Sequence, residues 1–139
     1  MKMNNSFDPS QTNETIELTL PLNGAYVSAA RLTVASIANR LGFDVDEIED
    51  LKAALSEACI YIIKKSPPDF RGTFHITFLM NTNLLKIKIE TDTRIAPNET
   101  GEEMGLLMIK ALMDDLTVIS DSETLTRIEM QKNHVKTTF

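Results

Sequence analysis

The stretch LGFDVDEIEDLKAALSEACIYIIKKS, residues 41–66, decides the fold of this chain. Its apolar residues recur every three or four positions, which predicts one amphipathic helix. Asp44 and Glu47 have the spacing of a capping box at the start of this helix, and Pro67 and Pro68 prevent its continuation. The predicted core stripe consists of Ile48, Leu51, Leu55, Ala58 and Ile62. A helix this long with one apolar face must pack against other elements.

The flanking sequence predicts those other elements. Residues 25–41 have helical spacing and end at Gly42, and residues 104–114 form a third, shorter helix. Alternating apolar and polar residues predict strands at 16–20, 74–80, 85–89, 116–119 and 125–130. The order predicts an α+β two-layer sandwich, with a mostly antiparallel sheet covered on one face by three helices. We expect residues 1–12 to be a flexible tail and residues 13–135 to form a single domain.

The composition excludes several classes of function. Asp and Glu number 20 against 14 Lys and Arg, a net charge of −6, so we expect no nucleic-acid binding. Cys59 is the only cysteine, which excludes an intramolecular disulfide and favours a reducing, cytoplasmic location. No signal peptide and no membrane span are predicted. His75 and His134 have no partners at metal-ligand spacing, so no zinc site is predicted.

Two charged residues stand out on the predicted helices. On a helical wheel Glu57 lies roughly 130° from the centre of the core stripe, on a flank with Ala54 and Tyr61. A carboxylate there can accept a proton from a nucleophile or orient water, although such a glutamate is more often simply solvated. Arg31 interrupts the apolar helix before it, and is either a solvated side chain or an anchor for a partner.

Three segments resemble the anti-sigma-factor serine kinases of bacterial stress and sporulation switches, which have the GHKL ATPase fold. These segments are RLTVASIANRLG (31–42), DEIEDLKAALSEAC (46–59) and EMGLLMIKALMDDLTV (103–118). Their order also matches, and the resemblance extends over about residues 14 to 133. It implies the histidine-kinase-like ATPase fold and a role in transcription regulation.

The resemblance also assigns roles to individual positions. It implies that Glu57 is the catalytic base, and that Tyr61 replaces the asparagine that binds magnesium. Asp92 stands near the position that recognises adenine, without the adjacent glycines, and Gly105 is the one glycine left of the closing Gly-x-Gly motif. The lid over the phosphates is largely deleted. Arg31 falls where the family places an arginine that contacts both the sigma factor and the anti-anti-sigma protein.

These replacements favour a degenerate member of the family. We expect a protein that binds a sigma factor or a STAS-domain anti-anti-sigma protein, with no cofactor and with ATP binding and kinase activity lost. The alternative is an active serine/threonine kinase that uses ATP and Mg²⁺ to phosphorylate a STAS-domain antagonist. A third possibility is a scaffold that pairs with a competent kinase of the family. The resemblance further implies a possible homodimer.

Overall fold

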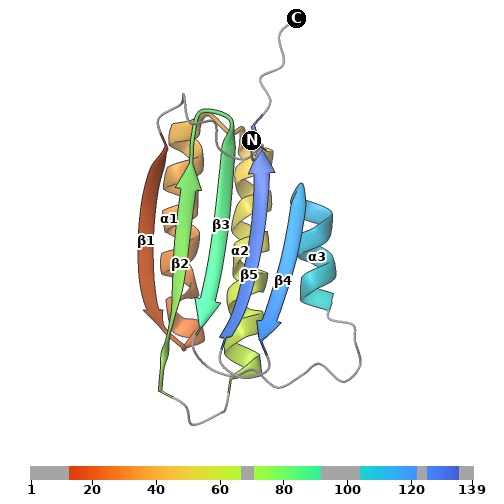
Figure 1. Cartoon of the computed structure of the whole chain (residues 1–139). Helices are drawn as coiled ribbons and strands as arrows, with labels where there is room; N and C mark the ends of the chain where they lie inside the picture. Colours follow the sequence, from red (N-terminus) through yellow and green to blue (C-terminus); the bar gives the residue numbers. More distant parts are fainter. Residues whose placement is uncertain (1–12, 67–70, 92–103, 122–124, 135–139) are drawn as a thin grey trace, which may run out of the picture.

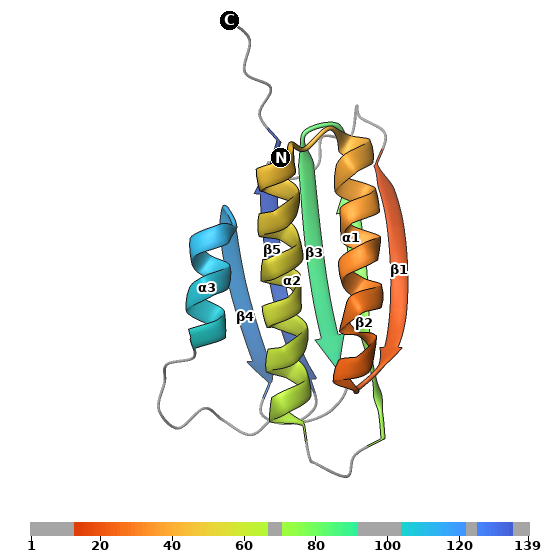
Figure 2. The same ribbon diagram turned by 180° about the vertical axis from the view of Figure 1, so that it is seen from behind.

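The computed structural model describes residues 13–66, 71–91, 104–121 and 125–134. These residues form one five-stranded sheet and a layer of helices on one of its faces, as predicted (Figure 1). Within these residues, no helix covers the other face of the sheet (Figures 1 and 2). The elements are β1 (Glu14–Pro21), a 3₁₀ turn (Gly24–Tyr26), α1 (Val27–Leu41), α2 (Val45–Lys65), β2 (Thr73–Met80), β3 (Leu84–Thr91), α3 (Met104–Leu112), β4 (Asp115–Asp121) and β5 (Leu125–Asn133).

The strands lie in the order β1-β2-β3-β5-β4, and every neighbouring pair is antiparallel. The register places the apolar side chains of successive strands in rows on the helix-covered face. One such row joins Leu18, Ile76, Ile89 and Ile128 across four strands. A shift of one residue in any strand would turn its apolar side chains to the solvent, so burial of this face fixes the register.

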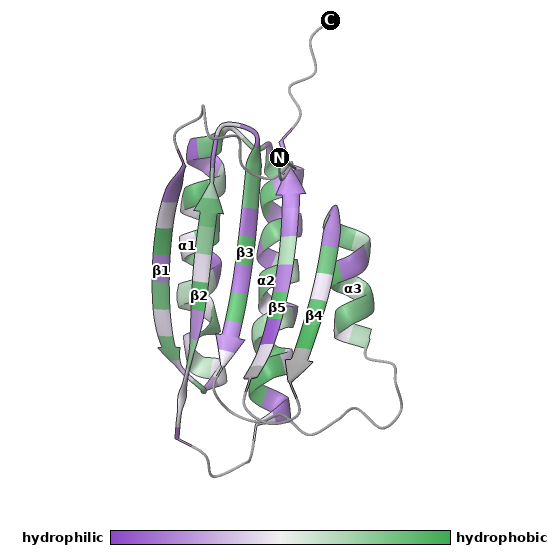
Figure 3. Cartoon of the chain, viewed as in Figure 1, coloured by the Kyte–Doolittle hydropathy of each residue, from purple (hydrophilic) through white to green (hydrophobic). Residues whose placement is uncertain are grey.

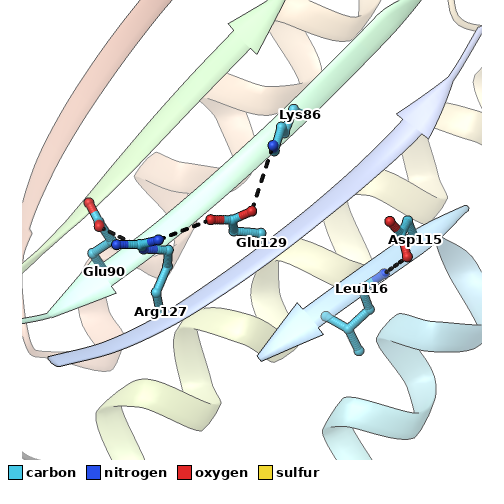
Figure 4. Close-up of polar contacts among 6 residues, drawn as sticks. All are labelled: Lys86, Glu90, Asp115, Leu116, Arg127 and Glu129. Atoms are coloured by element: carbon cyan, nitrogen blue, oxygen red, sulfur yellow. Dashed lines mark hydrogen bonds and ion pairs between the residues drawn. The ribbon is translucent and has the colours of Figure 1, made fainter. Parts of the chain in front are cut away.

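The opposite face of the sheet is polar, and the strands alternate in hydropathy along their length (Figure 3). Arg127 on β5 bridges Glu90 Oε2 at 2.9 Å and Glu129 Oε2 at 3.3 Å (Figure 4). Lys86 Nζ lies 3.6 Å from the other oxygen of Glu129. Because these side chains are partly exposed, each pair contributes little to stability. The network joins side chains of β3 and β5 on the polar face of the sheet.

Helix α2 is the central element of the helical layer, between α1 and α3 (Figure 2). Its predicted capping box is present, since Asp44 accepts from the Glu47 backbone and Glu47 accepts from the Asp44 backbone, both at 2.8 Å. Four residues of the predicted stripe are fully buried, and only Ile48 is half-buried. Gly42 ends α1 with φ of 91°, the left-handed conformation that glycine adopts without strain.

The structure corrects several predicted boundaries. The first helix does not begin at residue 25, because Asn23 accepts a hydrogen bond from the Ala25 backbone and starts a 3₁₀ turn before α1. Helix α3 ends at Leu112 and not at Asp114, and the strands are longer than their apolar runs. Pairing with neighbouring strands extends them through polar residues that alternation alone does not mark.

Candidate functional site

The candidate site residues lie on two opposite flanks of α2. Successive residues of a helix are about 100° apart, so Ser56 and Glu57 point to different neighbours. Ser56 faces α1, where it contacts Arg31, and Glu57 faces α3, where it contacts Gly105. One helix therefore separates Glu57, for which the resemblance implies the role of catalytic base, from Arg31, the residue expected to bind a protein partner.

Glu57 and Gly105, two residues far apart in sequence, are brought together by the packing of α2 against α3. A Cβ built on Gly105 would lie only 2.9 Å from Oε1 of Glu57. The absence of a side chain at Gly105 thus lets the carboxylate approach the first turn of α3. A negative charge is favourable there, because backbone N–H groups at a helix N-terminus carry a partial positive charge.

Tyr61 lies one turn after Glu57 on the same flank. It is half-buried and packs against the hydrophobic core, and the ammonium of Lys65 lies 5.8 Å from the centre of its ring. A tyrosine ring fills space that a shorter asparagine would leave open. The phenol at the position where the resemblance implies a magnesium ligand is therefore part of the packing against the core.

Cys59 is fully buried, and burial raises the pKa of its thiol from 9.0 to about 12. A thiol in such surroundings stays protonated and is a poor nucleophile. Asp92, the residue expected near the adenine position, lies outside the described residues, as do the predicted tail at 1–12 and the shortened lid.

Arg31 joins α1 to α2. Its Nη1 donates to Oγ of Ser56 at 2.6 Å, and it lies 3.4 Å from the backbone oxygen of Lys52. Arg31 is half-buried, so it is more enclosed than the solvated residue that the sequence alone most often indicates. The sequence did not identify Ser56 as the partner of Arg31. A helical wheel places Ser56 on a different flank from Glu57, but it cannot show which residue of another helix faces Ser56.

The described part of the chain has no group of three or more His, Cys, Asp or Glu side chains that could hold a metal ion. No helix among these residues is both long and apolar enough to cross a membrane.

A groove of about 480 Å³ lies at the far edge of the molecule, between β1 and the end of α1, and includes Ile16, Ile37 and Arg40.

Comparison with known proteins agrees with this architecture. Residues 20–132 match the family of histidine kinase-like ATPase domains. The chain is 32% identical over 126 residues to serine-protein kinases named RsbW from Bacillus cereus, Bacillus anthracis and Bacillus thuringiensis, an alignment that covers 78% of this chain and 79% of each relative. The chain belongs to the RsbW-like anti-sigma kinase family. The resemblance of its three segments to that family is thus confirmed.

A solved structure shows the same fold at lower sequence similarity. It contains the RsbU and RsbW domains of a Mycobacterium tuberculosis protein, and superposes with a TM-score of 0.68 at 16% identity. The match covers 86% of this chain and 32% of that longer chain. The RsbW-like α+β sandwich therefore persists where most residues differ.

Proposed function

We propose that this RsbW-like chain is a regulatory binding protein that occupies a sigma factor or a STAS-domain anti-anti-sigma protein in the cytoplasm. In this proposal it neither binds ATP nor transfers phosphate. Its contact with the partner is made by the α1–α2 surface around Arg31. Family membership supports the class of partner. The Glu57 flank of α2 supports the loss of ATP chemistry, and the Arg31 flank supports the retained binding of a partner.

The observation that carries the proposal is the contact between Glu57 and Gly105. The family places the catalytic base and a phosphate-binding glycine at these positions, and here the carboxylate lies directly against the glycine. A phosphate at the same place would meet a negative charge with no metal ligand at Tyr61 to compensate it. These residues do not fit Mg-ATP.

Arg31 provides the test of partner binding. We expect Arg31→Ala to weaken binding of the partner by about 2 kcal/mol or more, as for an arginine at the centre of an interface. The measurement is titration calorimetry with the co-encoded sigma factor or STAS-domain protein. Arg40→Ala is the matched control, because Arg40 is an exposed arginine near the end of the same helix.

The loss of the Arg31 hydrogen bonds should lower the free energy of unfolding by about 1 kcal/mol, which leaves the variant folded. Equal affinity of Arg31→Ala and wild type for the partner would contradict the proposed interface. Equal loss in Arg31→Ala and Arg40→Ala would point to a general effect of charge.

An active kinase is the second candidate, favoured by the retained Glu57 and by the relatives that are named serine-protein kinases. If it is correct, the chain incubated with Mg-ATP phosphorylates a serine of the STAS-domain protein, and Glu57→Gln abolishes this transfer. If the binding protein is correct, neither form transfers phosphate, and Glu57→Gln binds the partner as wild type does.

A further inference from the structure

Ser56 holds one edge of the Arg31 guanidinium. Its hydroxyl donates its single hydrogen to the backbone oxygen of Lys52 at 2.8 Å and accepts from Arg31 Nη1 at 2.6 Å. A hydroxyl has one donor and two acceptor positions, so both bonds form at once. The Ser56 side chain is nearly enclosed, with its residue 8% exposed, which keeps the acceptor in place.

The two contacts leave a defined edge of the guanidinium for another ligand. Within the described part of the chain, the hydrogen bonds of Arg31 all run from Nη1. Nε and Nη2 lie side by side on the planar group and carry three further N–H donors. Two parallel N–H groups match the two oxygens of a carboxylate.

We propose that Ser56 is a positioning residue, which orients Arg31 so that its Nε–Nη2 edge receives a carboxylate of the protein partner. This inference rests on the proposed function of the α1–α2 surface. Arginine loses considerable rotamer freedom when a partner fixes it. An arginine already held by Ser56 loses less on binding, so the partner is bound more tightly.

The surface around Arg31 indicates the rest of the partner's contact. Leu32, the residue after Arg31, is 72% exposed. Ser28 and Ser36 lie one turn before and one turn after Leu32, and both are exposed on the outer face of α1. Small residues on both sides of an exposed leucine allow a second backbone to come close. The fitting epitope is an Asp or Glu beside an apolar side chain.

A purely structural role of Ser56 predicts something different. The same hydrogen bond joins α1 to α2, and its loss could affect binding only through a less stable fold. A double-mutant cycle separates the two roles, because positioning requires Arg31 and a general loss of stability does not.

The experiment measures the affinity of four chains for the purified co-encoded sigma factor and for the STAS-domain protein, by titration calorimetry well below the melting temperatures. The chains are wild type, Ser56→Ala, Arg31→Ala and the double variant. We expect Ser56→Ala to weaken binding about tenfold in the wild-type background and less than about twofold in the Arg31→Ala background. Ser56→Thr, which retains a hydroxyl able to bond the carbonyl four residues earlier, should restore affinity to within about twofold of wild type.

Each other outcome contradicts either the positioning role of Ser56, the proposed interface or the proposed function. A tenfold loss in both backgrounds, or no loss from Ser56→Ala while Arg31→Ala weakens binding, overturns the positioning role alone. Unchanged affinity in Arg31→Ala overturns the proposed interface. Absence of binding by wild type to both the sigma factor and the STAS-domain protein overturns the proposed function together with this inference.

A readout without a partner checks the orientation directly. In the free protein, NMR of the Arg31 side chain reports rotation of the guanidinium. We expect this rotation to be at least several-fold faster in Ser56→Ala than in wild type, and unchanged in Ser56→Thr. Equal rotation rates in all three proteins would show that Ser56 does not orient the group.

Discussion

On α2, the role of each side chain depends on the neighbouring element that it faces. Ser56 and Glu57 are adjacent, yet Ser56 accepts a hydrogen bond from Arg31 on α1 and Glu57 lies against α3. Cys59, one turn after Ser56, reaches the core and has no contact with solvent. The same helix thus carries, within four positions, the proposed positioning residue, the residue that the resemblance names as catalytic base, and a core residue.

Cys59 gives a prediction for alkaline pH. Burial raises the pKa of its thiol from 9.0 to about 12, so between these values the unfolded chain loses the proton and the folded chain keeps it. The stability that this thiol contributes is complete below pH 9 and falls as the pH rises toward 12. Compared with Cys59→Ala, wild type should lose about 1.4 kcal/mol more unfolding free energy between pH 7.5 and pH 10.

Denaturant titrations of both proteins at the two pH values measure this difference. All other ionisable groups are the same in both proteins, so their contributions cancel in the comparison. An equal loss in wild type and Cys59→Ala would mean that the thiol ionises at the same pH in the folded and unfolded chains.

At the scale of elements, α2 begins where its capping box places it. Asp44→Ala removes the side-chain acceptor for the Glu47 backbone, which should lower the free energy of unfolding by about 1 kcal/mol. Asp44→Asn keeps an oxygen at the same position and should lose much less. Urea unfolding followed by circular dichroism distinguishes the two, and equal losses would show that the charge of Asp44 matters more than its hydrogen bond.

The α2–α3 contact predicts a dependence of Gly105 on Glu57. Alanine has a higher helix propensity than glycine by up to about 1 kcal/mol, but its Cβ would meet the Glu57 carboxylate. We therefore expect Gly105→Ala to stabilise the fold by about 0.5 kcal/mol or more in a Glu57→Ala background, and by less in wild type. Thermal unfolding of the four proteins measures this coupling; the same gain in both backgrounds would contradict the contact.

At the scale of the whole molecule, the proposal predicts that Mg-ATP does not stabilise the fold. A ligand at about ten times its dissociation constant adds roughly 1.4 kcal/mol to the stability of the native state, which raises the melting temperature by several degrees. We expect no measurable shift with millimolar Mg-ATP, either in wild type or in Tyr61→Asn, because the sequence still lacks the glycines adjacent to Asp92 and most of the lid. A shift of several degrees in wild type would overturn the loss of nucleotide binding.

The sequence by itself determined the local elements and the family. Some signals depend only on neighbours within a few positions and can be read directly from the sequence. They are the capping residues, the glycine after α1, and the spacing of apolar residues that is typical of helices or of strands. Family motifs likewise named Glu57, Tyr61, Arg31 and Gly105, because motifs record residue types at set spacings. Asp92, named in the same way, lies outside the described residues.

Only the tertiary structure decided which of these residues meet. The sheet inserts β5 between β3 and β4, and the helical layer places Arg31 against Ser56, 25 positions away. Such contacts depend on how whole elements pack, to which many distant side chains contribute at once. A helical wheel shows the flank on which Ser56 or Glu57 lies. Which residue of the neighbouring helix faces it is set by the way the helices pack over their shared core.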